Sequence, residues 1–128
     1  MQYEYFYGAQ AEQFSFYRIP KALFTEPNFR ELSTDAKVLY GILLDRMSLS
    51  LKNQWIDAQN KVYIIFTVEE IMDALNCANQ KATRLMVELE KRAGLIERKR
   101  QGLGRPNLIY VKNFAATIND KSCEKGDS

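Results

Sequence analysis

The chain has 128 residues, of which 46% are hydrophobic and 27% charged, and its net charge is +2. This balance is typical of one soluble globular domain with a buried core. No apolar run approaches the roughly 18 residues that a membrane-spanning helix needs, and the N-terminus lacks a signal-peptide pattern, so we expect a cytoplasmic protein without membrane contact. With no histidine and two cysteines that fit no metal or redox spacing, the usual metal sites and catalytic pairs are excluded. We therefore expect no enzyme, no metal and no cofactor.

The first 17 residues contain seven of the chain's fifteen aromatic residues and almost no charge. Rings at this density require burial, either against this domain or against another copy of the chain. We expect the first four to form much of a dimer interface; the alternative is that they cover the first long helix. These four are Tyr3, Tyr5, Phe6 and Tyr7.

An extended segment over residues 16–24 and a turn over residues 26–29 precede the first long helix. Ser33-Thr34-Asp35 supplies its N-cap, and we expect it to run to about Ser48. The apolar residues that recur at helical spacing are Val38, Leu39, Ile42, Leu43 and Met47. Residues 55–57 and 62–66 then predict a hairpin, whose second strand is apolar throughout and should lie near the core.

Two short helices follow. Thr67-Val68-Glu69-Glu70 is a capping box, and an apolar stripe continues from it to Leu75. After a turn, Asn79 is a fair N-cap for a helix that ends before Gly94, a residue suited to the left-handed position after a helix. Its buried face is predicted to hold Ala82, Leu85, Met86, Leu89 and Ala93.

A basic hairpin closes the pattern, with strands over residues 95–100 and 107–114 around a Gly102–Pro106 turn. Two helices followed by a charged hairpin predict an α+β fold, a winged helix-turn-helix with an additional N-terminal aromatic-rich dimerisation segment. From Gln80 to Lys112 there are nine basic and three acidic residues, whereas the rest of the chain has nine basic and thirteen acidic ones. Positive charge gathered on two consecutive elements is typical of contact with a phosphate backbone.

The second helix of such a motif reads bases with its N-terminal part. At 100° per residue, Gln80, Arg84, Val87 and Lys91 point away from the buried face, flanked by Lys81, Thr83 and Glu88. The predicted base-reading residues are Gln80, Lys81, Thr83 and Arg84. Arginine and lysine pair with guanine, and glutamine with adenine. The exposed polar face of any amphipathic helix would look the same.

The predicted wing adds a second contact. Arg105 at its tip suits a minor groove, where A·T-rich sequence deepens the negative potential. The residues expected to meet phosphates or the minor groove are Asn79, Arg98, Lys99, Arg100, Arg105 and Lys112. The alternative is an ordinary hairpin whose charges only keep it soluble.

The residues also resemble the N-terminal domain of the RepA_N family of plasmid replication initiators from low-GC Gram-positive bacteria. The similarity runs in order from about Tyr17 to Phe114. It is carried by Leu32-Ser33-Thr34-Asp35-Ala36-Lys37, Leu39-Tyr40-Gly41, residues 43–50, Lys52-Asn53, Trp55-Ile56-Asp57, residues 62–67, Glu69-Glu70-Ile71-Met72, residues 94–107 and residues 109–114. The resemblance implies a homodimeric winged helix that binds repeated double-stranded DNA sites (iterons) in a plasmid origin to initiate replication.

Together with the aromatic start and the polar end of the chain, the resemblance predicts a division into an aromatic segment (1–16), a winged-helix DNA-binding domain (17–114) and a polar tail or linker (115–128). The tail would lead to a C-terminal domain outside this chain, through which host replication proteins are contacted. Bound dimers could pair further across DNA. Two other functions remain open on the same scaffold: a transcription regulator, or a protein–protein interaction module.

Overall fold

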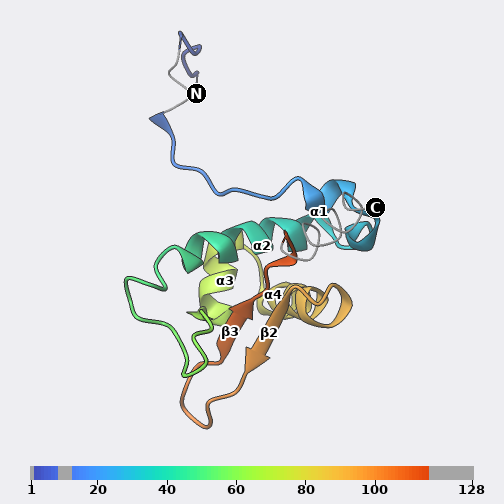
Figure 1. The fold of residues 1–128 in the computed structure, drawn as a ribbon. Helices are drawn as coiled ribbons and strands as arrows, with labels where there is room; N and C mark the ends of the chain where they lie inside the picture. Colours follow the sequence, from blue (N-terminus) through green and yellow to red (C-terminus); the bar gives the residue numbers. More distant parts are fainter. Residues whose placement is uncertain (1, 9–12, 116–128) are drawn as a thin grey trace, which may run out of the picture.

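The helices and strands assemble around one long helix (Figure 1). The computed structural model describes residues 2–8 and 13–115. The elements in chain order are α1 (Ala22–Thr25), the 3-10 turn η2 (Pro27–Phe29), α2 (Thr34–Met47), β1 (Ile64–Ile65), α3 (Val68–Leu75), α4 (Asn79–Val87), the π-helical turn η3 (Glu88–Arg92), β2 (Ile96–Lys99) and β3 (Leu108–Val111). None of the helices in this described part has the length and apolar character needed to cross a bilayer.

The predicted α+β winged-helix arrangement is confirmed. α3 and α4 form the helix pair, and β2 and β3 pair antiparallel as the wing, with Arg98 opposite Ile109. β1 pairs with β3 on its other side, so the sheet order is β1-β3-β2. The predicted hairpin before α3 appears as a single antiparallel bridge between Ile56 and Val62.

Local sequence signals account for most helix ends. The Ser33 side chain accepts a hydrogen bond from the backbone N–H of Ala36 at the start of α2. Thr67 and Glu70 form the predicted capping box at the start of α3. Gly94, with φ 66°, takes the left-handed position that follows η3. Asn79 differs from the prediction: it is the first residue of α4, whose N-cap position belongs to Ala78 without a side-chain cap.

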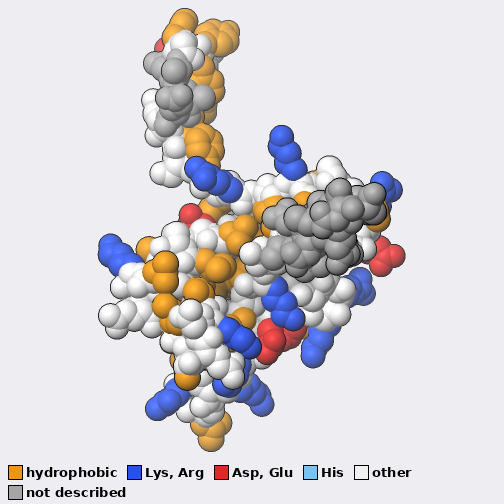
Figure 2. Space-filling view, in the orientation of Figure 1, with side chains coloured by type: hydrophobic (Ala, Val, Ile, Leu, Met, Phe, Trp, Pro, Cys, Tyr) orange, Lys and Arg blue, Asp and Glu red, His pale blue; other side chains and the backbone are white. Residues whose placement is uncertain are grey.

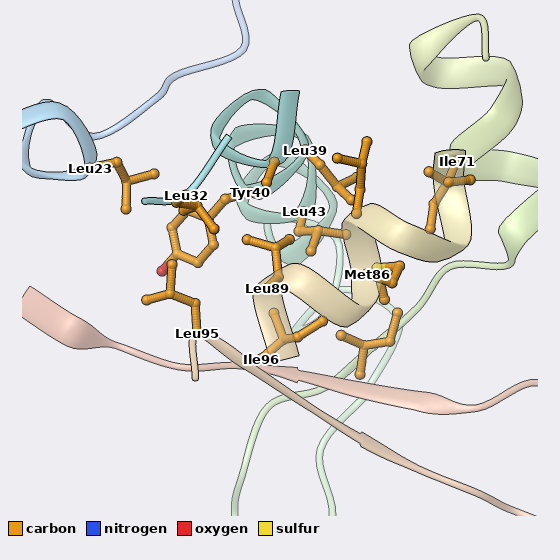
Figure 3. Packing of buried hydrophobic residues seen from close by; sticks show 14 of the residues in the cluster. Leu23, Leu32, Leu39, Tyr40, Leu43, Ile71, Met86, Leu89, Leu95 and Ile96 are labelled. Atoms are coloured by element: carbon orange, nitrogen blue, oxygen red, sulfur yellow. The ribbon is translucent and has the colours of Figure 1, made fainter. Parts of the chain in front are cut away.

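The core lies where α2 meets the helix pair and the sheet (Figure 3). Leu39 and Leu43 of α2 are fully buried, as are Leu85 of α4 and Leu89 of η3. Tyr40 closes one end of this core: its hydroxyl donates to the carbonyl of Lys112 at 2.9 Å, just beyond β3. Burial raises the pKa of the Tyr40 phenol to about 12. The long helix is therefore fixed to the helix pair and to the base of the wing.

The aromatic N-terminal segment lies on the outside of this domain. Tyr3, Tyr5, Phe6 and Tyr7 are 84%, 82%, 61% and 66% exposed. Figure 1 shows the chain before α1 running away from the helices, and Figure 2 shows apolar side chains along it. These four rings therefore do not cover the first long helix, which removes the alternative given above. The dimer contact stays a prediction.

One crossing anchors that segment to the domain. A Cβ placed on Gly41, in the middle of α2, would lie 2.9 Å from the carbonyl oxygen of Arg18 and 2.9 Å from a side-chain carbon of Ile19. Only glycine lets the backbone of the incoming segment come this close to the helix. The position of Gly41 inside a helix is thus explained by packing.

Candidate nucleic-acid interface

α4 presents a polar face outward, as the periodicity predicts. Ala82, Leu85 and Met86 are buried, whereas Gln80, Thr83 and Arg84 are exposed. Three of the four predicted base-reading side chains are thus on one accessible face in the first turns of α4. Val87, 40% exposed, extends this face by one further turn.

Lys81 is the fourth member of that set, and it lies at the edge of the face. Its ammonium group forms an ion pair with Asp35 of α2 at 2.8 Å, and the two side chains are 43% and 52% exposed. An ion pair this exposed stabilises the fold by no more than about 1 kcal/mol. Lys81 is therefore directed toward the first turn of α2 and is only loosely held there.

Glu88 corrects the helical projection. It was expected to flank the outward face, but it is buried, and its carboxylate accepts hydrogen bonds from the backbone N–H and, at 2.9 Å, from the hydroxyl of Ser33. At Glu88 the helix changes from α4 to the wider π-helical turn η3. The projection gave Glu88 only a flanking position, and its hydrogen bonds with Ser33 before α2 account for its burial.

Arg98 corrects the reading of the wing. The burial of β2 alternates from Ile96 inward, and Arg98 shares the inner face. Its guanidinium donates to Glu90 at 2.8 and 3.1 Å, its backbone N–H donates to the same carboxylate at 3.0 Å, and the two side chains are only 25% and 16% exposed. Arg98 is thus a partner of Glu90 within the fold and not a free cation of the wing.

The pKa of the Glu90 carboxyl follows from the same contacts. Its partial burial acts to raise the pKa, but the hydrogen bonds from the Arg98 side chain and backbone, together with the charge of Arg98, outweigh this effect. The pKa of Glu90 is therefore held below its usual value.

The wing itself projects beyond the rest of the domain, and Figure 2 shows Lys and Arg side chains gathered at that end. Lys99, Arg100 and Arg105 are all exposed. The base of the turn is held by a hydrogen bond from the Gln101 side-chain amide to the carbonyl of Pro106, at 2.7 Å. The predicted wing cations other than Arg98 are thus accessible to a ligand.

A groove of about 390 Å³ separates the helix pair from the wing. Asn79 at the start of α4 lines it on one side, and Arg105 and Pro106 line it on the other, with Arg98 at its wall. The structure therefore brings the start of the predicted recognition helix and the tip of the wing to one concave surface.

Lys112 belongs to a different surface. With Lys99 and Lys61 it lines a hollow of about 650 Å³, which also contains Asp57 and Glu97. Lys61 is not among the predicted site residues, because it lies outside the helix pair and the wing, where the basic residues of the sequence gather. In the described residues no cluster of three or more His, Cys, Asp or Glu side chains is placed to hold a metal ion.

Comparison with known proteins decides the family. Residues 15–125 match the family described as the N-terminus of replication initiator protein A (RepA). The chain belongs to this family. The resemblance stated from the sequence is thereby confirmed.

A bacterial protein matches most of this chain. The chain is 33% identical over 103 residues to the "41 kDa protein" of Lactobacillus helveticus, a match that covers 80% of this chain and 28% of that relative. The chain thus spans little more than a quarter of that protein's length.

Solved structures of similar chains carry the same fold. One described as "N-Terminal domain of DNA binding protein" is 36% identical with a TM-score of 0.72, over 99% of this chain and 98% of that one. "Structure of Rep-DNA complex" is 39% identical with a TM-score of 0.72, over 86% and 84%. "Structure of MDR initiator" is 41% identical with a TM-score of 0.69, over 86% of each chain.

Within this family member, the acidic residues of the interface region are arranged unequally. Glu88 and Glu90 bind inside the domain, and Glu97 is the acidic residue between Gln80 and Lys112 that is exposed. The sequence spacing of these three residues does not predict which of them is exposed, since all three lie in polar stretches. The exposed side chains around α4 and the wing are consequently mostly basic.

Proposed function

We propose that this chain binds double-stranded DNA sequence-specifically, without catalysis, at repeated sites in a plasmid origin, as the origin-recognition part of a replication initiator. The observation that carries the proposal is the groove that Asn79 of α4 and Arg105 of the wing both line. The exposed residues Gln80, Thr83 and Arg84 follow Asn79 in the first turns of α4. Membership in the RepA family and the similarity to a structure described as a Rep-DNA complex support it.

In this proposal the first turns of α4 enter the major groove. Arg84 pairs with a guanine and Gln80 with an adenine, because their side chains match the hydrogen-bonding edges of those bases. Arg105 enters the adjacent minor groove. Lys99, Arg100 and Lys112, with Asn79 at the helix N-terminus, hold phosphates.

A homodimer is the second part of the proposal. Tyr3, Tyr5, Phe6 and Tyr7 are largely exposed in one chain, and a segment this apolar is expected to be covered by a second copy. Deleting residues 1–13 should then convert a dimer into a monomer in light scattering, while the melting temperature of the winged helix stays near that of the full chain. A dimer that survives the deletion contradicts this assignment.

Pairing of bound dimers and contacts with host replication proteins belong to the same proposal, in which the host contacts concern regions outside this chain. The chain covers only 28% of its curated relative, so such contacts are assigned to the remaining part of the longer protein. The tail from residue 115 would lead there; residues 116–128 lie outside the described residues.

The test is fluorescence-anisotropy binding to duplexes tiled across the chain's own coding region and the DNA upstream, at two salt concentrations. Tight binding confined to a few repeated tiles supports origin recognition. Equal, weak and strongly salt-dependent binding to every tile contradicts it, because contacts with phosphates alone do not distinguish one DNA sequence from another. Binding confined to promoter DNA would instead favour a transcription regulator.

Arg84→Ala sharpens that test, with Lys52→Ala as its matched control, since Lys52 is an exposed cation in the loop after α2. If Arg84 reads a base, Arg84→Ala should weaken the binding free energy by about 1–3 kcal/mol on the preferred tile and by little on random DNA. Lys52→Ala should bind both as the unchanged chain does. Equal losses on preferred and random DNA would make Arg84 a phosphate contact.

A further inference from the structure

One apolar side chain stands at the tip of the basic wing. Leu103 is 104% exposed, more than any other large hydrophobic residue in the described part of the chain. A single exposed leucine is ordinary on a protein surface. Its setting is not ordinary, because Leu103 is the apex of a projecting hairpin on which Arg100 and Arg105 are also exposed.

The backbone around Leu103 is narrow and braced. Gly102 and Gly104 flank it with φ of 115° and 77°, and apart from its neighbours in the chain neither has any residue within 4 Å of the position where a Cβ would lie. The backbone N–H of Arg105 donates to the carbonyl of Gly102 at 3.3 Å, and Gln101 bonds to Pro106 below the turn. Leu103 therefore projects from a slim support without neighbouring side chains on either flank.

A slim, apolar tip beside arginines fits a particular kind of surface. Arginine is drawn to the negative potential of a narrow minor groove. Apolar side chains such as leucine act as wedges there, entering between base steps and bending the duplex. Burying the leucine against sugars and bases also removes its apolar surface from water.

We propose that Leu103 is a wedge that enters the minor groove beside Arg105 when the wing docks on DNA, and that it selects a deformable base step at that position. This inference rests on the proposed DNA-binding function. It assigns to the wing tip a role in choosing and bending the site, in addition to the electrostatic role of its arginines. Pyrimidine–purine steps such as TA and CA deform most easily, so these are the steps that it should favour.

The experiment compares Leu103→Ala and Leu103→Phe on the tightest-binding tile. Leu51→Ala is the matched control, because Leu51 is 70% exposed in a loop away from the wing. Anisotropy measures affinity at several salt concentrations, and energy transfer between dyes at the two duplex ends measures bending. All three variants should keep the melting temperature of the unchanged chain, since both leucines are exposed.

Leu103→Ala should weaken binding about tenfold and reduce the bend, because most of the wedge's apolar contact is lost. Leu103→Phe should retain both, and Leu51→Ala should change neither. The slope of log K against log salt concentration should be the same for Leu103→Ala as for the unchanged chain. Arg105→Ala should lower that slope by about 0.9, the value for one phosphate contact.

The opposite outcomes separate the wedge from the wider function. Unaltered affinity and bending in Leu103→Ala, on a tile that the unchanged chain binds tightly, overturns the wedge and leaves DNA binding standing. A change of oligomeric state in Leu103→Ala, seen by light scattering, also overturns it in favour of a contact between copies. Failure of the unchanged chain to bind any tile overturns both proposals.

Discussion

Replacing Glu88 by alanine tests how the end of α4 is fixed to the start of α2. The Glu88 carboxylate accepts the backbone N–H and the hydroxyl of Ser33, whose own side chain caps α2 through the N–H of Ala36. A glutamate beside a helix N-terminus also interacts favourably with the partial positive charge there. Glu88→Ala removes the interactions of the carboxylate, keeps the cap between Ser33 and Ala36, and leaves the backbone N–H of Ser33 without its partner.

The magnitude follows from what is lost. A hydrogen bond to a charged group contributes about 1.5–3 kcal/mol, and a negative charge near a helix N-terminus contributes about 0.3–1 kcal/mol. Glu88 is buried, so water replaces its contacts only in part. We expect Glu88→Ala to lower the free energy of unfolding by about 2–4 kcal/mol. Glu88→Gln, which keeps one acceptor oxygen, should cost about half as much.

The assay is urea unfolding followed by circular dichroism, with Glu97→Gln as control because Glu97 is exposed on β2. The control should lie within about 0.5 kcal/mol of the unchanged chain. Adding Ser33→Ala completes a double-mutant cycle, in which we expect a coupling energy of at least about 1 kcal/mol. Additive effects of Glu88→Ala and Ser33→Ala, or a Glu88 variant as stable as the control, would refute this account of the anchor.

Two further perturbations follow from other contacts. Gly41→Ala gains about 1 kcal/mol of helix propensity, but its methyl group would lie 2.9 Å from the carbonyl of Arg18, so we expect a net loss of stability and faster hydrogen exchange over residues 13–19; a raised melting temperature with unchanged exchange would contradict the crossing. The pKa of Glu90 is lower in the folded chain than in the unfolded chain. The ionised Glu90 therefore stabilises the fold above the ordinary glutamate pKa of about 4.3, and this contribution is lost as the pH falls through the pKa of the folded state. Glu90→Gln should therefore flatten the acid side of a stability profile taken between about pH 7 and 3, and an unchanged acid slope would refute the role of this pair.

Sequence reasoning succeeded where the relevant interaction is local. The capping box of Thr67 and Glu70 spans one turn, and the left-handed position at Gly94 depends on the conformation of one residue. The buried stripe of α4 likewise follows from helical spacing alone. These features fixed the two helices and the wing in order, and with them most of the candidate interface.

The corrections at Glu88 and at Arg98 both come from contacts between different elements. Ser33 and Glu88 are 55 residues apart, and no sequence pattern within either segment predicts their hydrogen bond. The π-helical turn that begins at Glu88 was also not predicted, yet Leu89 is buried and Lys91 is exposed, as the projection of an ideal α-helix predicts. Glu90 and Arg98 are closer in sequence, but a turn and a change of element lie between them.

These two glutamates change how the charge of the interface should be counted. In a sum of formal charges, Glu88 and Glu90 offset two of the basic residues around them. Both carboxylates, however, bind groups inside the domain. Arg98 is removed from the accessible cations by the same pairing. Phosphate contacts are therefore expected from fewer residues than the sequence suggests, and Arg105→Ala should lower the salt slope of binding where Arg98→Ala mainly lowers stability.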